Sequence, residues 1–282
     1  TGAITSVREE DIEAPNAVSA DNLLQGKVAG LTINQNSAQP GSSMSVNIRG
    51  RLSPRGSNSP LYVIDGVPVN SGDLSRATPT ANVLAGINPN DVANVTVLKD
   101  AASTAIYGSR GSNGVILITT KSGLSGKTRI SLDADYGSVQ PGVSPGRARP
   151  LTTEENIMLI GEALLNNAGM AANYGLNQGN IREFVTGENG FGIDPNVNTN
   201  WYDVVTRRGN QQQYNLAADG GNDKTTFSVS GGYFKQEGTI PKSDFTRYSG
   251  KINLKHKASD KFTFGANILG SSSNLRGLLN SG

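Results

Sequence analysis

The sequence predicts an α+β region followed by a series of antiparallel β-strands. Glycine is abundant, at 35 of 282 residues, whereas aromatic residues make up only 6%, which favours turns and loops between strands over a helical protein. Short apolar segments punctuated by Gly, Pro, Asn and Ser fill the first 126 residues, a mixture typical of α+β folds. From Thr128 onward, apolar and polar residues alternate, so each strand has one apolar and one polar face.

The first region contains several short elements with recognisable ends. Asp21 is placed to cap a helix over 22–28, which Gly30 ends. A segment of small residues from Asp100 to Tyr107 tolerates a helix, and a glycine-punctuated turn follows it. Ile87–Asp91 is expected to form a turn that starts a short helix. Compact, β-branched segments predict strands over 45–49, 61–65, 92–98 and 115–120.

The second region predicts long strands joined by connections of unequal length. Period-two alternation is clearest over 129–136, 226–233, 247–255 and 261–268. The connections at 220–223 and 258–260 are tight, whereas 236–244 is longer and 137–211 is very long, with a helix expected over 153–165. Short turns that alternate with long loops are typical of outer-membrane barrels. Alternation alone fits a soluble sandwich equally well.

Composition argues against several classes of function. The formal charge is +2, cysteine is absent and His256 is the one histidine, so we expect no nucleic-acid partner, no thiol chemistry, no metal site and no cofactor. Asp65 and Asp100 are carboxylates that nothing in the sequence brings together, and Asp65 is expected to cap its own turn. The longest apolar runs fall short of the about 18 residues of a membrane-spanning helix. Because there is one histidine and the carboxylates are unpaired, we predict that the protein is not an enzyme.

Four motifs in the first region together resemble a known family. They are LQGKVAGL at 24–31, IRG at 48–50, PLYVIDGVPV at 60–69 and LKDAASTAIYGSRGSNGVILITTK at 98–121. In this order they resemble the plug domain of TonB-dependent outer-membrane transporters, in the SusC/RagA-like branch of Bacteroidetes-type bacteria. The segments NWYDVV, GGNDKTTFSVSGGYFKQEGTI and FTRYSGKINLKHK resemble the start of the SusC-like barrel.

The resemblance implies a domain organisation. Residues 1–126 would form the plug domain, and 127–282 the first strands of a transmembrane β-barrel, with an extracellular loop over about 137–211. Transporters of this kind have 22 strands, so the barrel is only partly present and we expect the chain to be part of a longer protein. The TonB box is expected upstream of Thr1.

The resemblance also implies a function and its partners. The protein would import oligosaccharides or oligopeptides through a plugged barrel in the outer membrane of a Gram-negative bacterium. Its partners would be a SusD-like surface lipoprotein, TonB with its ExbB/ExbD motor, a glycan or peptide substrate, and outer-membrane lipid. The alternative is a surface receptor or adhesin that transports nothing and binds a ligand through its long loop.

Two arginines are the candidate site residues. Arg49 and Arg110 lie beside glycines in the IRG and GSRG motifs. Plug arginines in the family pair with carboxylates of the barrel wall, a task that suits the permanently charged, bidentate guanidinium. The partners would lie beyond Gly282 or be Asp133 and Asp135; the alternative is two ordinary surface arginines.

Five aromatic residues are candidates for a membrane interface. An interfacial belt is expected to include Trp201, Tyr202, Tyr214, Tyr233 and Tyr248. Packing within the long loop, or stacking on a sugar, are alternatives for Trp201.

Overall fold

A computed structural model describes residues 4–8, 18–35, 37, 39–42, 44–50, 58–69, 83–142, 149–188 and 190–277. The start of the first predicted domain (1–3) and the end of the second (278–282) therefore lie outside the described residues. The chain divides into two compact units, and each has its own hydrophobic core. The larger unit comprises Thr1–Val139, Gly209–Gly238 and Lys242–Gly282, and the smaller one Gln140–Arg208 and Thr239–Pro241.

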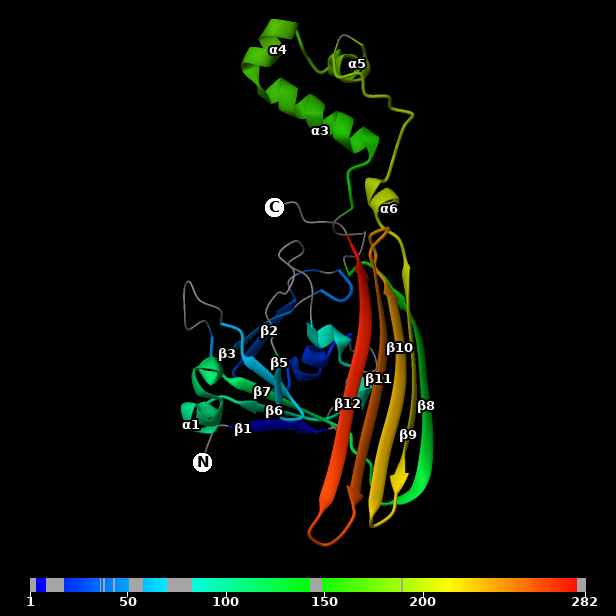
Figure 1. Ribbon diagram of the computed structural model, residues 1–282. Helices are drawn as coiled ribbons and strands as arrows, with labels where there is room; N and C mark the ends of the chain where they lie inside the picture. The colour runs from blue at the N-terminus through cyan, green and yellow to red at the C-terminus, as the bar shows by residue number, and fades with distance from the viewer. Residues whose placement is uncertain are drawn as a thin grey trace. The chain divides into compact units, whose positions relative to one another are not determined.

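The N-terminal part of the larger unit, called the plug region below, is built around a five-stranded sheet (Figure 1). The strand order is β1-β6-β7-β4-β5, in which β4 and β7 are parallel and the other neighbours antiparallel. Strands β2 and β3 form a separate antiparallel pair. The strands are β1 (Ile4–Arg8), β2 (Leu31–Gln35), β3 (Met44–Ile48), β4 (Leu61–Ile64), β5 (Val67–Val69), β6 (Val92–Leu98) and β7 (Val115–Thr120). The strands predicted over 45–49, 61–65, 92–98 and 115–120 are confirmed to within one residue at each end.

Short helical turns connect these strands. They are η2 (Ala20–Leu24), η3 (Val83–Gly86), η4 (Pro89–Asp91), α1 (Ala101–Thr104) and η5 (Ala105–Gly111). The Asp100 carboxylate caps α1 by accepting a hydrogen bond of 2.9 Å from the Ser103 backbone N–H. Gly108 and Gly114 have φ of 60° and 92°, a conformation that glycine adopts without a steric penalty. The helix-tolerant segment and the glycine turn predicted here are therefore present.

The helix predicted over 22–28 is wrong. The segment forms the short turn η2 (Ala20–Leu24), and the Asp21 side chain does not cap it. Instead, the buried Asp21 carboxylate accepts a hydrogen bond of 3.0 Å from the Tyr62 hydroxyl. Burial, together with the neighbouring Asp21 charge, raises the pKa of Tyr62 well above its usual value. A buried polar partner outweighs the local capping preference.

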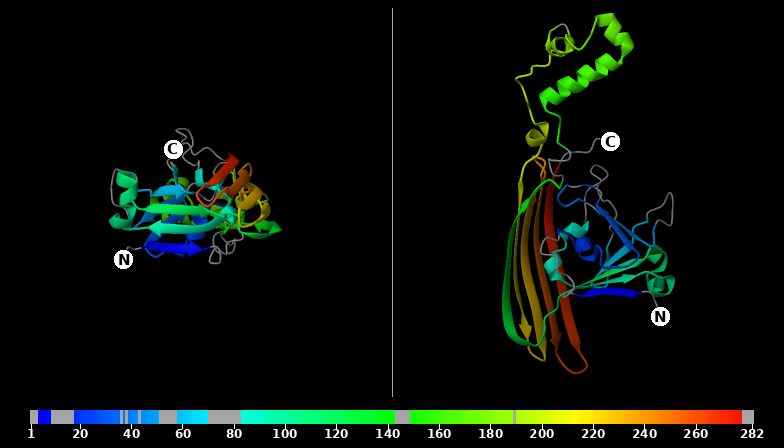
Figure 2. Two further views of the ribbon diagram at one scale, coloured as in Figure 1. Left: turned by 60° about the horizontal axis from the view of Figure 1, so that its bottom comes forward. Right: turned by 180° about the vertical axis from the view of Figure 1, so that it is seen from behind.

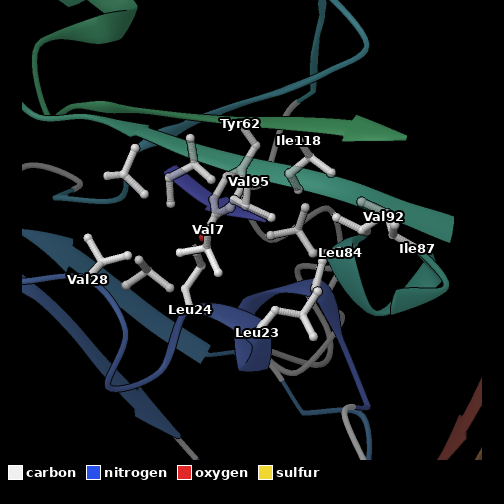
Figure 3. Packing of buried hydrophobic residues seen from close by; sticks show 14 of the residues in the cluster. Val7, Leu23, Leu24, Val28, Tyr62, Leu84, Ile87, Val92, Val95 and Ile118 are labelled. Atoms are coloured by element: carbon white, nitrogen blue, oxygen red, sulfur yellow. The ribbon is translucent and has the colours of Figure 1, made fainter. Parts of the chain in front are cut away.

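One hydrophobic core joins the sheet to η2 and the β2–β3 pair. Figure 3 shows Val7, Leu24 and Val95 from three different elements facing one another. Val46 and Ile48 of β3 belong to the same cluster, so both lie on the inner face, as their spacing predicts. The cluster comprises Val7, Ala20, Leu23, Leu24, Val28, Val46, Ile48, Tyr62, Leu84, Ile87, Val92, Val95, Val97, Ile116 and Ile118.

Five long strands, called the wall below, form the second sheet of the larger unit (Figures 1 and 2). Consecutive strands pair antiparallel in the order of the sequence. Their phase agrees with the predicted alternation. The strands are β8 (Gly126–Val139), β9 (Gly209–Gly221), β10 (Thr225–Glu237), β11 (Asp244–Lys257) and β12 (Thr263–Arg276).

The wall has the opposite polarity to a soluble sheet. Its apolar face is exposed: Ile130, Leu132 and Ile268 are 74%, 69% and 61% accessible. The polar face of β9–β11 is buried in part against the plug region, with Asn215, Arg247 and Lys251 at 4%, 2% and 2%. A sheet in water buries its apolar face, whereas a membrane strand turns it toward lipid. Of the two architectures that alternation left open, the arrangement favours a membrane barrel over a soluble sandwich.

The smaller unit is helical. It contains α3 (Thr153–Asn166), α4 (Ala168–Tyr174), α5 (Ile181–Thr186) and α6 (Trp201–Val205), and it packs around Ile157, Leu164, Leu176 and Val185. The helix expected over 153–165 is thus confirmed; Thr152 and Glu155 form a capping box at its start. Hydrogen bonds from the Arg149 guanidinium, at 2.6 and 2.7 Å, lower the pKa of Glu155 to about 2. Among the described residues, no helix has the length and apolar character needed to cross a membrane.

Candidate functional site: the interface between the plug region and the wall

Arg247 of β11 is the central contact of the interface. Its Nη1 lies 2.6, 2.9 and 3.2 Å from the carbonyl oxygens of Val18, Ala85 and Ile87. The guanidinium also lies over the Phe234 ring, 5.2 Å from its centroid. A single wall residue thus binds two separate segments of the plug region, one at residue 18 and one at residues 85–87.

Lys251, four residues further along β11, makes the second cationic contact. Its ammonium donates a hydrogen bond to the carbonyl of Lys121, the residue after β7. The buried Asp91 carboxylate accepts a hydrogen bond from the Ser230 hydroxyl and interacts electrostatically with both Arg247 and Lys251. The direct acceptors of the two wall cations are therefore carbonyl oxygens, and one carboxylate of the plug region lies near both without a direct ion pair among the described residues.

Polar side chains extend the interface on both sides of this cluster. The Asn88 amide donates to Asn215 Oδ1 at 2.8 Å while its own oxygen caps η4 by accepting from the Asn90 N–H. This is the turn and short helix expected at 87–91. Asn267 of β12 donates to Asp65 Oδ2 at 2.6 Å.

The expectation that Asp65 caps its own turn needs correction. Asp65 has φ of 48°, and its carboxylate accepts from the Thr120 N–H and hydroxyl, both at 2.8 Å. It therefore ties the end of β4 to the end of β7 and to the wall. Asp100 caps α1 instead, so the two carboxylates serve separate structural roles. No group of three potential metal ligands occurs among the described residues.

Close backbone packing brings the two surfaces together. A Cβ placed on Gly232 of β10 would lie 2.6 Å from Asn88 Nδ2 and 2.7 Å from Ser249 Oγ. A Cβ on Gly86 would lie 2.6 Å from Ser271 Oγ. Apolar contact completes the interface, where Ala85 packs with Phe234 and Phe245 of the wall.

The predicted site residues lie elsewhere in the plug region. Arg49 and Arg110 are exposed, and no ion pair within the described part of the chain joins them to Asp133 or Asp135. Arg49 lines a pocket of about 400 Å³ together with Lys99, and Arg110 is not among the residues lining it. Opposite views place the neighbouring α1 on the side of the plug region away from the wall (Figures 1 and 2). The two arginines and the wall contacts thus occupy opposite ends of β6 and β7.

Arg247 and Lys251 are functional candidates that residue-by-residue inspection of the sequence missed. The available signal was their position on the polar face of a long strand, beside Ser249. A cation on that face must find acceptors once the face is buried. The sequence does not show which face is buried, so the signal could not be read in advance.

The predicted aromatic row is partly assembled. Tyr214, Tyr233 and Tyr248 are neighbours across three strands, with ring centroids 6.3 and 5.1 Å apart. His256 and Phe264 pair in the same way eight residues further along β11, at 5.3 Å. Trp201 belongs to α6 of the smaller unit and is 65% exposed.

Comparison with known proteins agrees with this architecture. Residues 1–115 match the family model described as TonB-dependent Receptor Plug Domain. The chain is 32% identical to TonB-dependent receptor P26 of Formosa agariphila over 95% of its length, and 32% identical to TonB-dependent receptor SusC of Bacteroides thetaiotaomicron over 90%. It covers 24% and 23% of those proteins, so it spans about a quarter of the curated relatives it matches.

Solved structures give the same result. The RagAB peptide importer in its closed-closed state matches 98% of this chain and 31% of its own chain, at 29% identity and a TM-score of 0.78. The siderophore receptor PirA of Acinetobacter baumannii matches 97% of the chain at 19% identity and a TM-score of 0.58, which shows the shared fold.

Gly232 tests the fit between the two surfaces. Gly232→Ala should displace Asn88 and loosen the plug region, because its new methyl group would lie inside van der Waals distance of the Asn88 amide. Gly231→Ala is the matched control, since a Cβ there meets nothing within 4 Å. We expect limited proteolysis to cut the plug region faster in Gly232→Ala alone. Equal cleavage rates in the two variants would contradict this interpretation.

Arg247 tests the hydrogen bonds themselves. Arg247→Lys keeps the charge but shortens the side chain and removes the Nη1 that contacts Val18, Ala85 and Ile87, at a cost on the order of 2 kcal/mol. Thermal unfolding, followed by protease access to the plug region, should begin at a lower temperature. Arg129→Lys, in an exposed pair with Asp219, should leave that temperature unchanged. An unaltered onset in Arg247→Lys would show that the Arg247 hydrogen bonds do not hold the surfaces together.

Proposed function

Because the chain carries the plug domain and first barrel strands of a SusC/RagA-like TonB-dependent receptor, we propose that it forms the plugged pore of an outer-membrane nutrient importer. Its cargo would be an oligosaccharide or an oligopeptide. The observation that carries the proposal is the inverted wall, whose polar face is covered by the plug and whose apolar face is exposed. A covered polar lumen becomes a path for a hydrophilic solute once the cover moves.

The exposed face of the wall suits an outer membrane of a Gram-negative bacterium. The tyrosine row at Tyr248 and the aromatic pair at His256 are eight residues apart on one strand. At about 3.3 Å per residue and a tilt of about 40°, that spacing spans about 20 Å. The value is close to the about 25 Å apolar band of outer-membrane barrels, which aromatic girdles flank. Lipid would therefore contact the strands between these two rows.

The plug contacts suit displacement by a pulling partner. They are individual side-chain hydrogen bonds, some from wall cations to carbonyls such as those of Val18 and Lys121, and others between side chains, such as Asn88 with Asn215. Each contributes about 1–3 kcal/mol and can break in sequence, so that local opening leaves the strand ladders of the wall intact. We propose that TonB, driven by the ExbB/ExbD motor, supplies the pull from the periplasm.

The helical unit is the proposed site for a surface partner. Met158, Leu159 and Trp201 are large apolar side chains that are 62%, 54% and 65% exposed, and they are available to a protein partner. A SusD-like lipoprotein that covers the extracellular mouth would bury such residues. A non-transporting receptor or adhesin that uses the same unit to bind its ligand is the second candidate, favoured by the same exposed side chains.

Arg49 and Arg110 are proposed to hold the plug on its other side. Arg49 has φ of 60°, a conformation that costs about 1–3 kcal/mol for a non-glycine residue, and it lines the pocket with Lys99. A wall carboxylate from strands beyond β12 would find two cations there. On the side of β8–β12, Arg247 and Lys251 already bind carbonyl oxygens of the plug region.

Import is tested with the full-length protein in living cells. We expect labelled oligosaccharides or oligopeptides to accumulate in cells with intact TonB, and accumulation to cease when TonB is deleted or the proton gradient is collapsed. The control is surface binding of the same probes, which should persist in both cases. Binding without any TonB-dependent accumulation would favour the receptor or adhesin.

Charge reversal tests the proposed lock. Arg49→Glu and Arg110→Glu should weaken plug retention and admit a large glycopeptide antibiotic, because the reversed charge would repel a wall carboxylate. Lys224→Glu, in an exposed turn of the wall, is the control and should leave the barrier intact. Normal plug retention and transport in both arginine variants would remove the locking role.

A further inference from the structure

Three cations form a column along one strand of the wall. Arg247, Lys251 and Lys255 occupy every fourth position of β11 and therefore share the face that the plug region covers. At about 3.3 Å per residue the column is about 26 Å long along the strand, which is about 20 Å along the membrane normal at a tilt of about 40°. Lys257 shares the face but is paired with Asp260 at 2.7 Å, so it is not counted in the column.

The plug region shows what chemistry the upper part of the column accepts. Arg247 contacts the carbonyl oxygens of Val18, Ala85 and Ile87, and Lys251 contacts the carbonyl of Lys121. The Asp91 carboxylate interacts with both cations. The bonded partners are all carbonyl oxygens, and the nearby carboxylates are Asp91 for both cations and Asp65 for Lys251. Lys255, in contrast, is exposed below the plug contacts.

The surroundings leave the positive charge of the column largely uncompensated within the wall. On the neighbouring strands, the residues of the same face opposite Lys251 and Lys255 are Ser230, Thr226, Leu269 and Gly265. Asp133 and Asp135 lie on β8, three strands from β11. That separation is about 14 Å, which exceeds the Debye length of about 8 Å at physiological salt. Asp219 of β9 is paired with Arg129.

We propose that this column guides anionic cargo, namely an oligomer that carries carboxylate or sulfate groups, through the lumen. Displacement of the plug removes the carbonyl acceptors from Arg247 and Lys251 and opens both cations to the lumen, where anionic groups can bind them in place of water. Anionic groups of the passing oligomer bind there in turn and reach Lys255 at the periplasmic end. The inference rests on the proposed import function and adds the charge class of its substrate.

Lys255 is the position at which to test the column, because the plug region does not cover it and its substitution leaves the plug contacts in place. The probes are labelled oligogalacturonates and their methyl esters, and oligoglutamate and oligoglutamine peptides. Each pair differs in charge on one backbone, and the two pairs separate an acidic sugar from an acidic peptide. TonB-dependent accumulation of the four probes is measured with the full-length protein and with Lys255→Gln, Lys255→Arg and Lys261→Gln.

We expect the full-length protein to accumulate the charged member of at least one pair in preference to the neutral one. Lys255→Gln should lower that preference about two- to fivefold, the range of a single solvated ion pair, and Lys255→Arg should restore it. Lys261→Gln removes the same charge from an exposed turn and should change nothing. An unchanged preference in Lys255→Gln, or an equal accumulation of charged and neutral probes, would overturn the column while import stands. Absence of TonB-dependent accumulation for all four probes would instead overturn import, and the column with it.

Discussion

The structure depends on the need to satisfy a buried polar sheet face. The wall strands expose their apolar side chains and bury Gln213, Asn215, Arg247 and Lys251 against the plug region. Burying such groups without partners would cost several kcal/mol each. The plug region is therefore constrained to present acceptors and small residues at defined positions along β9–β12. Its own hydrophobic core, centred on Val95 and Ile116, only has to hold that surface in shape.

This constraint explains why turns, not strands, face the wall. A strand inside a sheet has already used its carbonyls in the ladder, whereas Val18, Ala85 and Ile87 lie beside short 3-10 turns and keep carbonyl lone pairs for Arg247. Close approach of these turns is possible because Gly86 and Gly232 leave no Cβ between the surfaces. The wall cations thus require free carbonyls opposite them, and the two glycines let the turns that carry these carbonyls come close.

The sheet of the plug region links two ends with different tasks. At one end, Asp65, Asp91 and Lys121 contact the wall next to the segment that leads into β8. At the other end, Arg49 and Lys99 border a pocket on the side away from the wall. Contacts at both ends of β6 and β7 would fix the orientation of a plug in a lumen more firmly than contacts at one end.

Local patterns were enough to predict most of the strands, whereas their burial and their partners follow from the tertiary structure. Period-two alternation predicted four of the five wall strands, and the glycine turn with β-branched residues predicted β7, because both signals are local. The buried side of the wall depends on plug residues that are 130 to 229 residues from Lys251 and Arg247 in the sequence, so the roles of these two cations could not be predicted. Asp21 and Asp65 were misassigned for the same reason, since their partners Tyr62 and Thr120 are distant in sequence. Local preference gives way wherever a buried polar group must find its partner across the fold.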